Sequence, residues 1–422
     1  MGPVVGMVLA VAGCDAVMPD KAAPKKPSIS YSSNVSADQE AVAVDTIVTV
    51  SAKDGSVAHV GMESDKNKIG FEAEGSKWVA TRRLEPGTKY TITATGTGTD
   101  GKPGDFTRSF TTEALTLSQQ TYPSVIPLAG RTVGVGMPII VRFDIPVKNR
   151  ELFEKNMFVE TSQPVEGRWA WFNDREVHFR PKEYWPANTD VTIKILVNSL
   201  PAGNGIYGQQ DQIVHFTIGQ KVVAYVDVNT YTLTLKEDDK VVKTIPVSTG
   251  DSKHRTREGT KVIMEKLRKV DMDAATTGVD SDDDDYYDLE DVEYAMRLTN
   301  SGEFLHAAPW SVRSQGYANV SHGCTGMSTS NAQYLFGQMK QGDPVEYTGS
   351  PRKLEQGNGW TDWTLSWDDW VAKSALKEAP EPTATPTPSA SPTPSSSASR
   401  SPFTPLPSMT PSPTGIRTQN PA

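Results

Sequence analysis

Apolar and polar residues alternate through most of residues 28–272, and this period of two predicts strands rather than helices. The alternation is clear in AVDTIVTVSA and in LEPGTKYTITATG, where a Pro-Gly turn precedes Tyr90, Ile92 and Ala94. A second stretch repeats it in PIIVRFDIPV and DQIVHFTIG. The chain is therefore expected to be mainly β.

Two of these β stretches, residues 28–115 and 116–219, look like a diverged repeat. The Pro-Gly-Thr turn at Pro86 parallels the turn at Pro186, and each stretch closes on a similar strand, DFTRSFTT or DQIVHFTI. Short strands at regular spacing over about 100 residues are typical of immunoglobulin-like sandwiches. The sequence thus predicts two immunoglobulin-like β-sandwich domains, without the Cys–Trp–Cys set of antibody domains.

Residues 220–348 form a third, β-rich unit that ends with a helical pattern. Its first strands are predicted to turn at EDDK. Near its end, Ala332, Leu335, Phe336 and Met339 follow helical spacing. Ser328 or Thr329 can cap the start of this short helix, and Gly342 is expected to end it.

Both ends of the chain differ from this pattern. Residues 1–13 are an apolar run that ends in small residues before Cys14, which is similar to a bacterial lipoprotein signal, cut before a cysteine that is then lipidated. No Lys or Arg precedes the run, so an ordinary secretory signal or a frayed terminus are the alternatives. Either signal would place the chain outside the cytoplasm. Residues 14–27 would be a tether.

The segment after residue 348 divides into two parts. Residues 349–377 carry four tryptophans, which suit a packing stripe better than glycan stacking, and they are expected to pack on the third unit: Trp360, Trp363, Trp367 and Trp370. Residues 378–422 hold twelve of the thirty prolines and are predicted to be a disordered Pro/Ser/Thr tail. The net charge of −9 argues against a nucleic-acid partner, because phosphate binding needs a basic face.

The candidate chemistry lies around Cys324, one of only two cysteines. It follows Ser321, His322 and Gly323 and precedes the predicted helix, whose N-terminal amides and dipole would lower the pKa of the thiol. His306, at the end of an apolar strand, is a plausible acid–base partner for a cysteine nucleophile. The alternatives are an inert buried thiol or a zinc site; no carboxylate nearby supports the zinc, so no metal is expected.

Two further features have simpler explanations. The acidic run Asp280–Glu293 places Asp280, Asp282 and Asp284 at alternate positions, as calcium ligands would be. It lacks the glycine and the closing glutamate of a calcium loop, so a solvated insertion is favoured. His254 is expected on a solvated loop.

The segment SGEFLHAAPWSVRSQGYANVSHGCTGMSTSNA closely resembles the active-site signature of the L,D-transpeptidases, which have the YkuD-type fold. That signature is a histidine, a gap of fourteen to seventeen residues and then Ser/Thr-His-Gly-Cys. The gap here, residues 307–320, is fourteen residues long. The resemblance covers residues 28–375, including the two sandwiches and the tryptophan-rich segment, as in actinobacterial members.

The resemblance implies a role for each matching residue. Cys324 would be the nucleophile, His306 the general base and His322 a histidine that lines the site. The remaining implied groups are the oxyanion donors Gly323 and Cys324 and the substrate contacts Ser301, Gly302 and Ser321. This chain departs from the family at Gly326, where Asn is usual, at Ala307, where Ser is frequent, and at Thr277, where a lid Tyr stands.

The resemblance also implies the reaction and its setting. The expected enzyme is a cysteine-dependent acyltransferase that forms 3→3 crosslinks between peptidoglycan stem peptides, needs no cofactor and reacts with carbapenems. Its expected location is the outer face of the cell membrane, reached through a lipid on Cys14. An L,D-carboxypeptidase and a non-catalytic wall-binding relative are the alternatives.

Overall fold

The computed structural model describes residues 28–277, 282 and 286–377. Strands predominate, which confirms the predicted fold class. The predictions for the signal, Cys14, the tether and residues 378–422 lie outside the described residues. None of the helices described is long and apolar enough to cross a membrane.

The first β unit forms one folded sheet in the order β1-β3-β6-β5-β4-β7-β8-β2. Tyr90, Ile92 and Ala94 of its long strand β7 are all buried, which confirms the predicted period of two. These side chains meet Phe110 in a core separate from that of the second unit. The strands are β1 (Ser30–Ser33), β2 (Gln39–Val42), β3 (Thr49–Lys53), β4 (Gly55–Glu63), β5 (Lys68–Glu74), β6 (Lys77–Ala80), β7 (Lys89–Gly98) and β8 (Pro103–Thr112).

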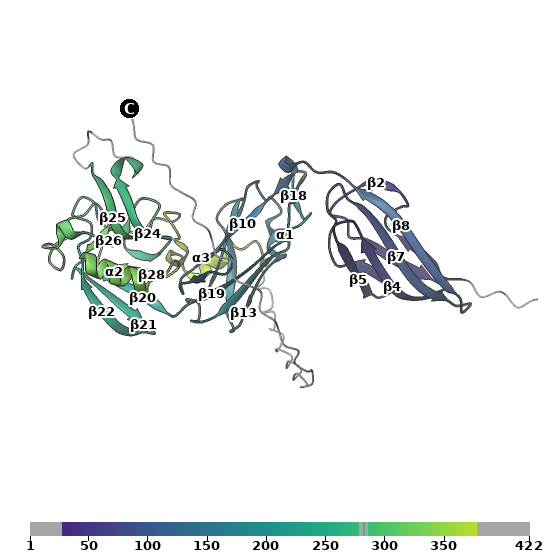
Figure 1. Ribbon diagram of the computed structural model, residues 1–422, viewed down its shortest axis with the longest axis horizontal. Helices are drawn as coiled ribbons and strands as arrows, with labels where there is room; N and C mark the ends of the chain where they lie inside the picture. Colours follow the sequence, from purple (N-terminus) through teal and green to yellow (C-terminus); the bar gives the residue numbers. More distant parts are fainter. Residues whose placement is uncertain (1–27, 278–281, 283–285, 378–422) are drawn as a thin grey trace, which may run out of the picture. The chain divides into compact units, whose positions relative to one another are not determined.

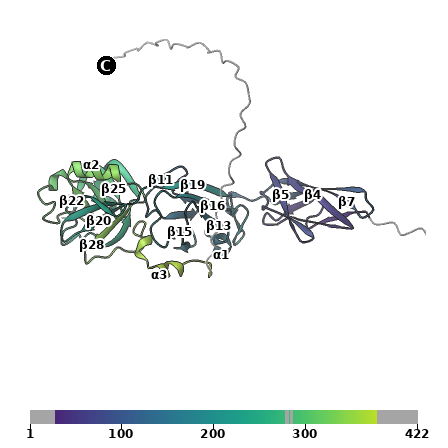
Figure 2. The same ribbon diagram turned by 90° about the horizontal axis from the view of Figure 1, so that it is seen from below.

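The second β unit has two four-stranded sheets, β10-β12-β15-β14 and β11-β19-β16-β13, and Figure 2 shows the second of them. Trp169, Trp171 and Trp185 are buried in its core. A small ribbon of β17, β18 and β9 completes it. Its elements are η1 (Leu117–Gln119), β9 (Gln120–Thr121), β10 (Pro123–Ile126), β11 (Thr132–Val133), β12 (Ile139–Phe143), α1 (Arg150–Glu154), β13 (Met157–Thr161), β14 (Gly167–Trp171), β15 (Glu176–Pro181), β16 (Asp190–Ile195), β17 (Pro201–Gly203), β18 (Ile206–Gly208) and β19 (Gln212–Ile218).

The third unit contains the sheets β22-β21-β20-β28-β23 and β24-β25-β26-β27, with helix α2 beside them (Figure 1). Ala332 and Leu335 of α2 enter the core that both sheets share. Its elements are β20 (Val222–Asp227), β21 (Thr232–Glu237), β22 (Lys240–Pro246), β23 (Gly259–Val262), β24 (Glu265–Asp273), η2 (Ala274–Thr277), β25 (Asp288–Arg297), β26 (Phe304–Ala307), η3 (Pro309–Ser311), β27 (Thr325–Met327), α2 (Thr329–Gln338) and β28 (Pro344–Thr348).

The predicted helix cap is present. The hydroxyl of Ser328 accepts a hydrogen bond from the Asn331 amide at 3.3 Å, which satisfies one of the free amides at the start of α2. The helix ends at Gln338, somewhat before the predicted stop at Gly342, and Met339 already has extended backbone.

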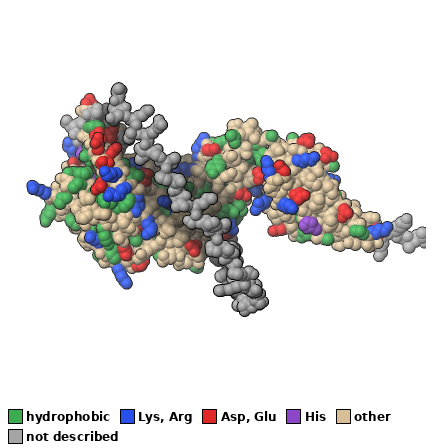
Figure 3. All heavy atoms as spheres, in the orientation of Figure 1, with side chains coloured by type: hydrophobic (Ala, Val, Ile, Leu, Met, Phe, Trp, Pro, Cys, Tyr) green, Lys and Arg blue, Asp and Glu red, His purple; other side chains and the backbone are tan. Residues whose placement is uncertain are grey.

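The acidic run lies on the hairpin of β24 and β25, where Figure 3 shows acidic side chains together. Asp282, Asp288 and Glu290 are exposed, as in a solvated insertion. Asp280 and Asp284, two of the three candidate calcium ligands, lie outside the described residues.

The tryptophan-rich segment packs on both the second and the third β units, where the prediction named the third alone. Its first part bonds the third unit at Ser301 and Glu258, and its last tryptophans bond the second. It contains η4 (Asp362–Thr364) and α3 (Trp367–Val371). The indole of Trp370 donates to the Arg168 carbonyl at 2.9 Å, and that of Trp363 donates to the Gly136 carbonyl at 2.8 Å. The Arg180 guanidinium lies over the rings of Trp363, Trp367 and Trp370.

A buried ion pair anchors the same segment. His178 Nδ1 lies 2.6 Å from Asp362 Oδ1, and His178 Nε2 lies 2.9 Å from Glu176 Oε1. Burial by itself lowers the pKa of His178. The carboxylates of Asp362 and Glu176 raise it by a larger amount, so that the pKa reaches about 9. The imidazolium is therefore the form present at neutral pH.

This pair predicts that stability falls in mildly alkaline solution. The folded pKa of His178 lies above its unfolded value of about 6.5, so the contribution is complete below that pH and is lost as the pH rises through 9. We expect the free energy of unfolding to fall by roughly 3 kcal/mol over this window. Thermal melts of wild type and Asp362→Asn at pH 6–10 test this.

The variant should be less stable at pH 6 and should lose most of the slope above pH 7. Glu151→Gln, which removes an exposed carboxylate paired with Lys155, is the control and should keep the slope. Parallel curves for wild type and Asp362→Asn would refute the assignment.

Candidate active site

Cys324 lies between a tight turn and strand β27. The hydroxyl of Ser321 closes this turn: it donates to the Cys324 carbonyl at 2.6 Å and accepts from the Gly323 amide at 3.1 Å. The Gly323 amide is therefore engaged by Ser321 in this structure, and its role as an oxyanion donor stays a prediction. The Cys324 amide makes no hydrogen bond within the described part of the chain, so it remains the available donor.

The thiol is protonated, contrary to the pKa predicted from its position before a helix. Its sulfur is surrounded by apolar side chains including Phe304, and burial raises the pKa of Cys324 to about 12, although a backbone hydrogen bond from Phe304 opposes the shift. Strand β27 separates the thiol from α2, so the helix amides do not reach it. The thiol instead donates to the Gly302 carbonyl at 3.3 Å.

His306 is a buried histidine at the end of β26 with one nitrogen committed. Its Nδ1 lies 2.8 Å from the Ala307 carbonyl, which can only accept, so Nδ1 carries the proton and Nε2 is left to receive one. Burial lowers the pKa of His306, which keeps the ring neutral at pH 7. Because a backbone carbonyl orients the ring, Ala307 in place of Ser costs nothing here.

Strand pairing brings the base and the thiol to one place. Strands β26 and β27 are parallel, and His306 pairs with Gly326, two residues after Cys324. No hydrogen bond joins Cys324 and His306 among the described residues, because the thiol is turned toward Gly302. Rotation of the Cys324 side chain away from Gly302 is the step that would let His306 take its proton.

Gly326 is required by packing. A Cβ at this position would lie 2.8 Å from the Cβ of Ala308, closer than such atoms approach. Its backbone is also held on both sides, since its amide donates to the Ser248 carbonyl and its carbonyl accepts from the Ser248 amide. Strand β27 therefore lies too close to Ala308 at Gly326 for the Asn that is usual in the family.

His322 stands at the rim of the site in a group of three rings. Its ring centroid lies 4.5 Å from that of His254 and 4.9 Å from that of Tyr287. The prediction of a solvated loop for His254 holds in part: the segment is a loop with exposed neighbours, but the His254 side chain is partly buried and its Nδ1 lies 3.0 Å from Asp251 Oδ1. His254 and His322 are far apart in the sequence, so no local pattern predicts their contact.

Of the other residues predicted to contact substrate, Gly302 lines a cavity and Ser301 is hydrogen-bonded within the protein. Gly302 lines a cavity of about 140 Å³ beside the thiol, together with Tyr287, Phe304 and Arg297. Ser301 is held by Asn358, whose side chain bonds its amide and its hydroxyl at 2.9 Å each. Thr277 lies in η2, and its side chain is outside what the structure describes.

Sequence reasoning missed a buried charged group behind the thiol, formed by Arg257, Lys261 and Glu303. Glu303 accepts from Lys261 Nζ at 2.5 Å and from Arg257 Nη1 at 3.0 Å. The available signal was a glutamate inside an otherwise apolar strand, GEFLHA.

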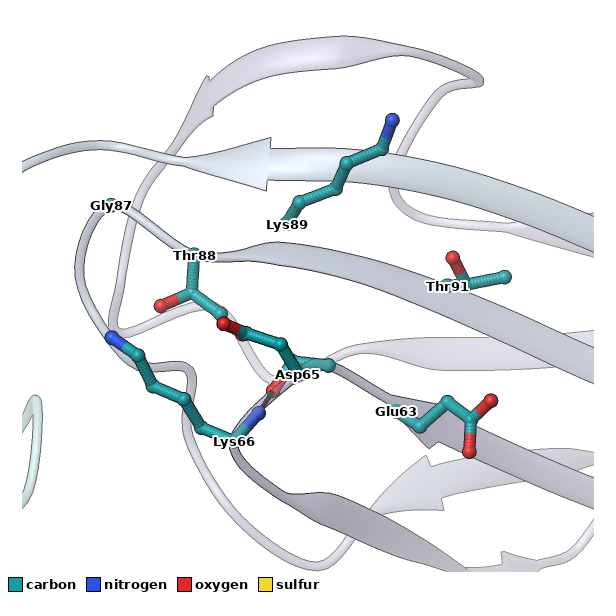
Figure 4. A pocket seen from close by; sticks show the side chains of 8 residues that line it. Glu63, Asp65, Lys66, Gly87, Thr88, Lys89 and Thr91 are labelled. Atoms are coloured by element: carbon teal, nitrogen blue, oxygen red, sulfur yellow. Dashed lines mark hydrogen bonds between the residues drawn. The ribbon is translucent and has the colours of Figure 1, made fainter.

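A second cavity, of about 430 Å³, lies on the first β unit (Figure 4). Charged side chains including Glu63, Lys66 and Lys89 line it, but neither histidine nor cysteine does. Over the described residues no group of three or more His, Cys, Asp or Glu side chains could hold a metal ion. The Cys324 region is therefore the candidate active site.

A family model for a catalytic domain covers the part of the chain that holds Cys324. The family model for the L,D-transpeptidase catalytic domain matches residues 221–346, and that for a bacterial Ig domain matches residues 39–200. L,D-transpeptidase 2 of Mycobacterium tuberculosis is 36% identical over 338 residues, which are 79% of this chain and 82% of the relative. L,D-transpeptidase 5 of the same species is 34% identical over 90% of this chain and 84% of the relative. A solved L,D-transpeptidase from Mycobacterium smegmatis is 33% identical, over 54% of this chain and 99% of that one, with a TM-score of 0.45.

The raised pKa of the thiol predicts slow alkylation at neutral pH. Since only the thiolate reacts, the rate with iodoacetamide should rise about tenfold per pH unit between pH 6 and 8. The measurement is the intact mass of the chain carrying Cys14→Ser, followed over time. A rate that is already constant with pH in this window would mean that the thiol is ionised, against the burial described above.

The contact at Gly326 predicts a paired stability effect. Gly326→Ala should destabilise the fold by about 1–3 kcal/mol, because the added methyl overlaps that of Ala308. Adding Ala308→Gly should recover most of the loss in urea unfolding. If Gly326→Ala is neutral, or if the second change brings no recovery, the contact does not determine the residue at position 326.

Proposed function

This chain belongs to the L,D-transpeptidase family, and from that premise we propose that it forms 3→3 crosslinks in peptidoglycan through a thioester on Cys324. The observation that carries the proposal is the neutral His306, with its Nε2 left to accept a proton, one strand away from the thiol. A nucleophile and a base in this relation suit acyl transfer without a metal or other cofactor.

In the first half-reaction, His306 Nε2 takes the proton of Cys324. The thiolate attacks the carbonyl that joins the L-centre of the diamino acid, third in a tetrapeptide stem, to the terminal D-Ala. The oxyanion that forms accepts a hydrogen bond from the Cys324 amide. The intermediate then collapses to a thioester, and D-Ala leaves with the proton returned by His306.

In the second half-reaction, the side-chain amine of a second stem attacks the thioester carbonyl. His306 takes a proton from this amine and returns it to the sulfur, so that the new amide bond and the free thiol form together. The thioester conserves the acyl energy of the donor bond, and no nucleotide is needed. Gly302 and the cavity beside it border the donor, while His322 lines the rim.

The setting of the reaction is part of the proposal. A lipid on Cys14 anchors the chain at the outer face of the cell membrane, and the two β units carry the active site toward the wall. The same thioester passed to water would make an L,D-carboxypeptidase, and a chain without turnover would be a wall-binding relative.

Incubation of the purified chain with a disaccharide-tetrapeptide tests the proposal. We expect mass spectrometry to show free D-Ala together with a 3→3 dimer, both abolished by Cys324→Ala. His306→Gln should lower the rate by roughly 10²–10⁴-fold, the usual contribution of a general base. The intact mass of the wild type should increase by the mass of one carbapenem molecule, and that of Cys324→Ala should not change.

Cys14→Ala is the matched control and should behave as the wild type in solution. D-Ala with tripeptide and no dimer would identify a carboxypeptidase instead. No D-Ala and no carbapenem adduct, from a folded chain, would refute catalysis.

A further inference from the structure

Three charged side chains are buried together behind the thiol. The Lys261 side chain has no exposed surface, and that of Glu303 is 4% exposed. Glu303 bonds Lys261 through one oxygen and both the guanidinium and the amide of Arg257 through the other. Burial of ionised groups is costly unless each is paired, so the balance of charge here matters.

Within the buried part of this group, one carboxylate serves two cations. Arg257 has a second partner, Glu355, but that side chain is 54% exposed and therefore largely compensated by water. Two cations thus share one buried carboxylate. At the sulfur of Cys324 that carboxylate disfavours the thiolate, and Lys261 and Arg297 favour it.

Contacts on two sides connect Lys261 to the nucleophile. On one side its partner Glu303 follows Gly302, whose carbonyl holds the thiol. On the other side the Lys261 ammonium lies 3.7 Å from the centre of the Tyr347 ring, and the Tyr347 hydroxyl bonds that of Thr325 at 2.7 Å. Thr325 directly follows Cys324, so both contacts lead to residues that flank the thiol.

We propose that Lys261 is a positioning residue whose buried ammonium, held in place by Glu303, stabilises the thiolate of Cys324 as the proton leaves for His306. The proposal rests on Cys324 being the nucleophile, as inferred above. Lys261 touches neither substrate nor the leaving group; it acts through the sulfur. It offsets part of the cost of forming an anion in an apolar surrounding.

The charged and titratable groups that face this pair are few. Among the described residues, Lys261 is surrounded by Glu303, Arg257 and Tyr347. Cys324 interacts with Glu303, Arg297, Tyr287 and Tyr347. Burial lowers the pKa of Lys261 to about 8, against Glu303 and the thiolate, which raise it. The charge of Lys261 therefore lowers the pKa of the Cys324 thiol, and the thiolate raises the pKa of Lys261. Titration of Lys261 should for this reason change the pH dependence of thiol reactivity.

The test is the rate of iodoacetamide addition at pH 6–10 in the chain carrying Cys14→Ser. In this background the rise should weaken over about one pH unit near pH 8, where the ammonium that favours the thiolate is lost, and should then resume. Lys261→Met should react about tenfold more slowly below pH 8 and should keep rising above it without a bend. A purely structural lysine would produce no bend.

Two more variants separate charge from packing. Lys261→Met with Glu303→Gln should recover most of the lost rate, because the carboxylate that disfavours the thiolate goes as well. Lys266→Met is the matched control: this half-buried lysine donates to the carbonyls of Phe336 and Met339 at the end of α2, and its loss should leave the profile unchanged.

Superimposable profiles for Lys261→Met and its parent, or a double variant slower than the single one, would overturn the proposal. If Lys261→Met does not fold, Glu303→Gln alone still tests it, since the bend should then move to lower pH. Alkylation requires no turnover, so failure of the crosslinking assay with the expected profiles would refute the proposed function and leave the role of Lys261 intact.

Discussion

The parallel pairing of β26 with β27 is the constraint on which the site depends. It sets His306 beside Gly326 and so fixes the base relative to Cys324. Parallel neighbours cannot be joined by a tight hairpin and need a crossover of about a dozen residues or more. The fourteen residues between His306 and Ser321 are this crossover, which gives a physical reason for the spacing of the signature. A much shorter gap could not return the chain to the same edge in the same direction.

Local patterns predicted what depends on local chemistry. The alternation around Tyr90 and the cap at Ser328 both follow from neighbouring residues, and the His-Gly-Cys motif predicts Cys324 as the nucleophile. The environment of the thiol could not be predicted in this way. Its protonation depends on apolar groups from β24, β25 and β26, and the sequence shows only that a helix follows.

The same limit applies to contacts between distant segments. His254 meets His322, and Lys261 meets Glu303, across separations that no periodicity reports. The tryptophans were recognised as a packing stripe, but nothing in their spacing shows that Arg180 and Arg168 of the second β unit receive them. This correction matters for function: the segment that bonds Ser301 through Asn358 is also buried in the second β unit. Removing that unit would therefore disturb the strand that carries His306.

The hydrogen bond from Cys324 to the Gly302 carbonyl has a consequence for the survival of the protein. Peroxides and disulfides attack thiolates much faster than thiols, so a cysteine held protonated on a carbonyl is a poor target for oxidants. Only a partner that turns the sulfur toward His306 exposes its reactivity. If the chain works outside the cytoplasm, as proposed above, such a cysteine resists oxidation between turnovers.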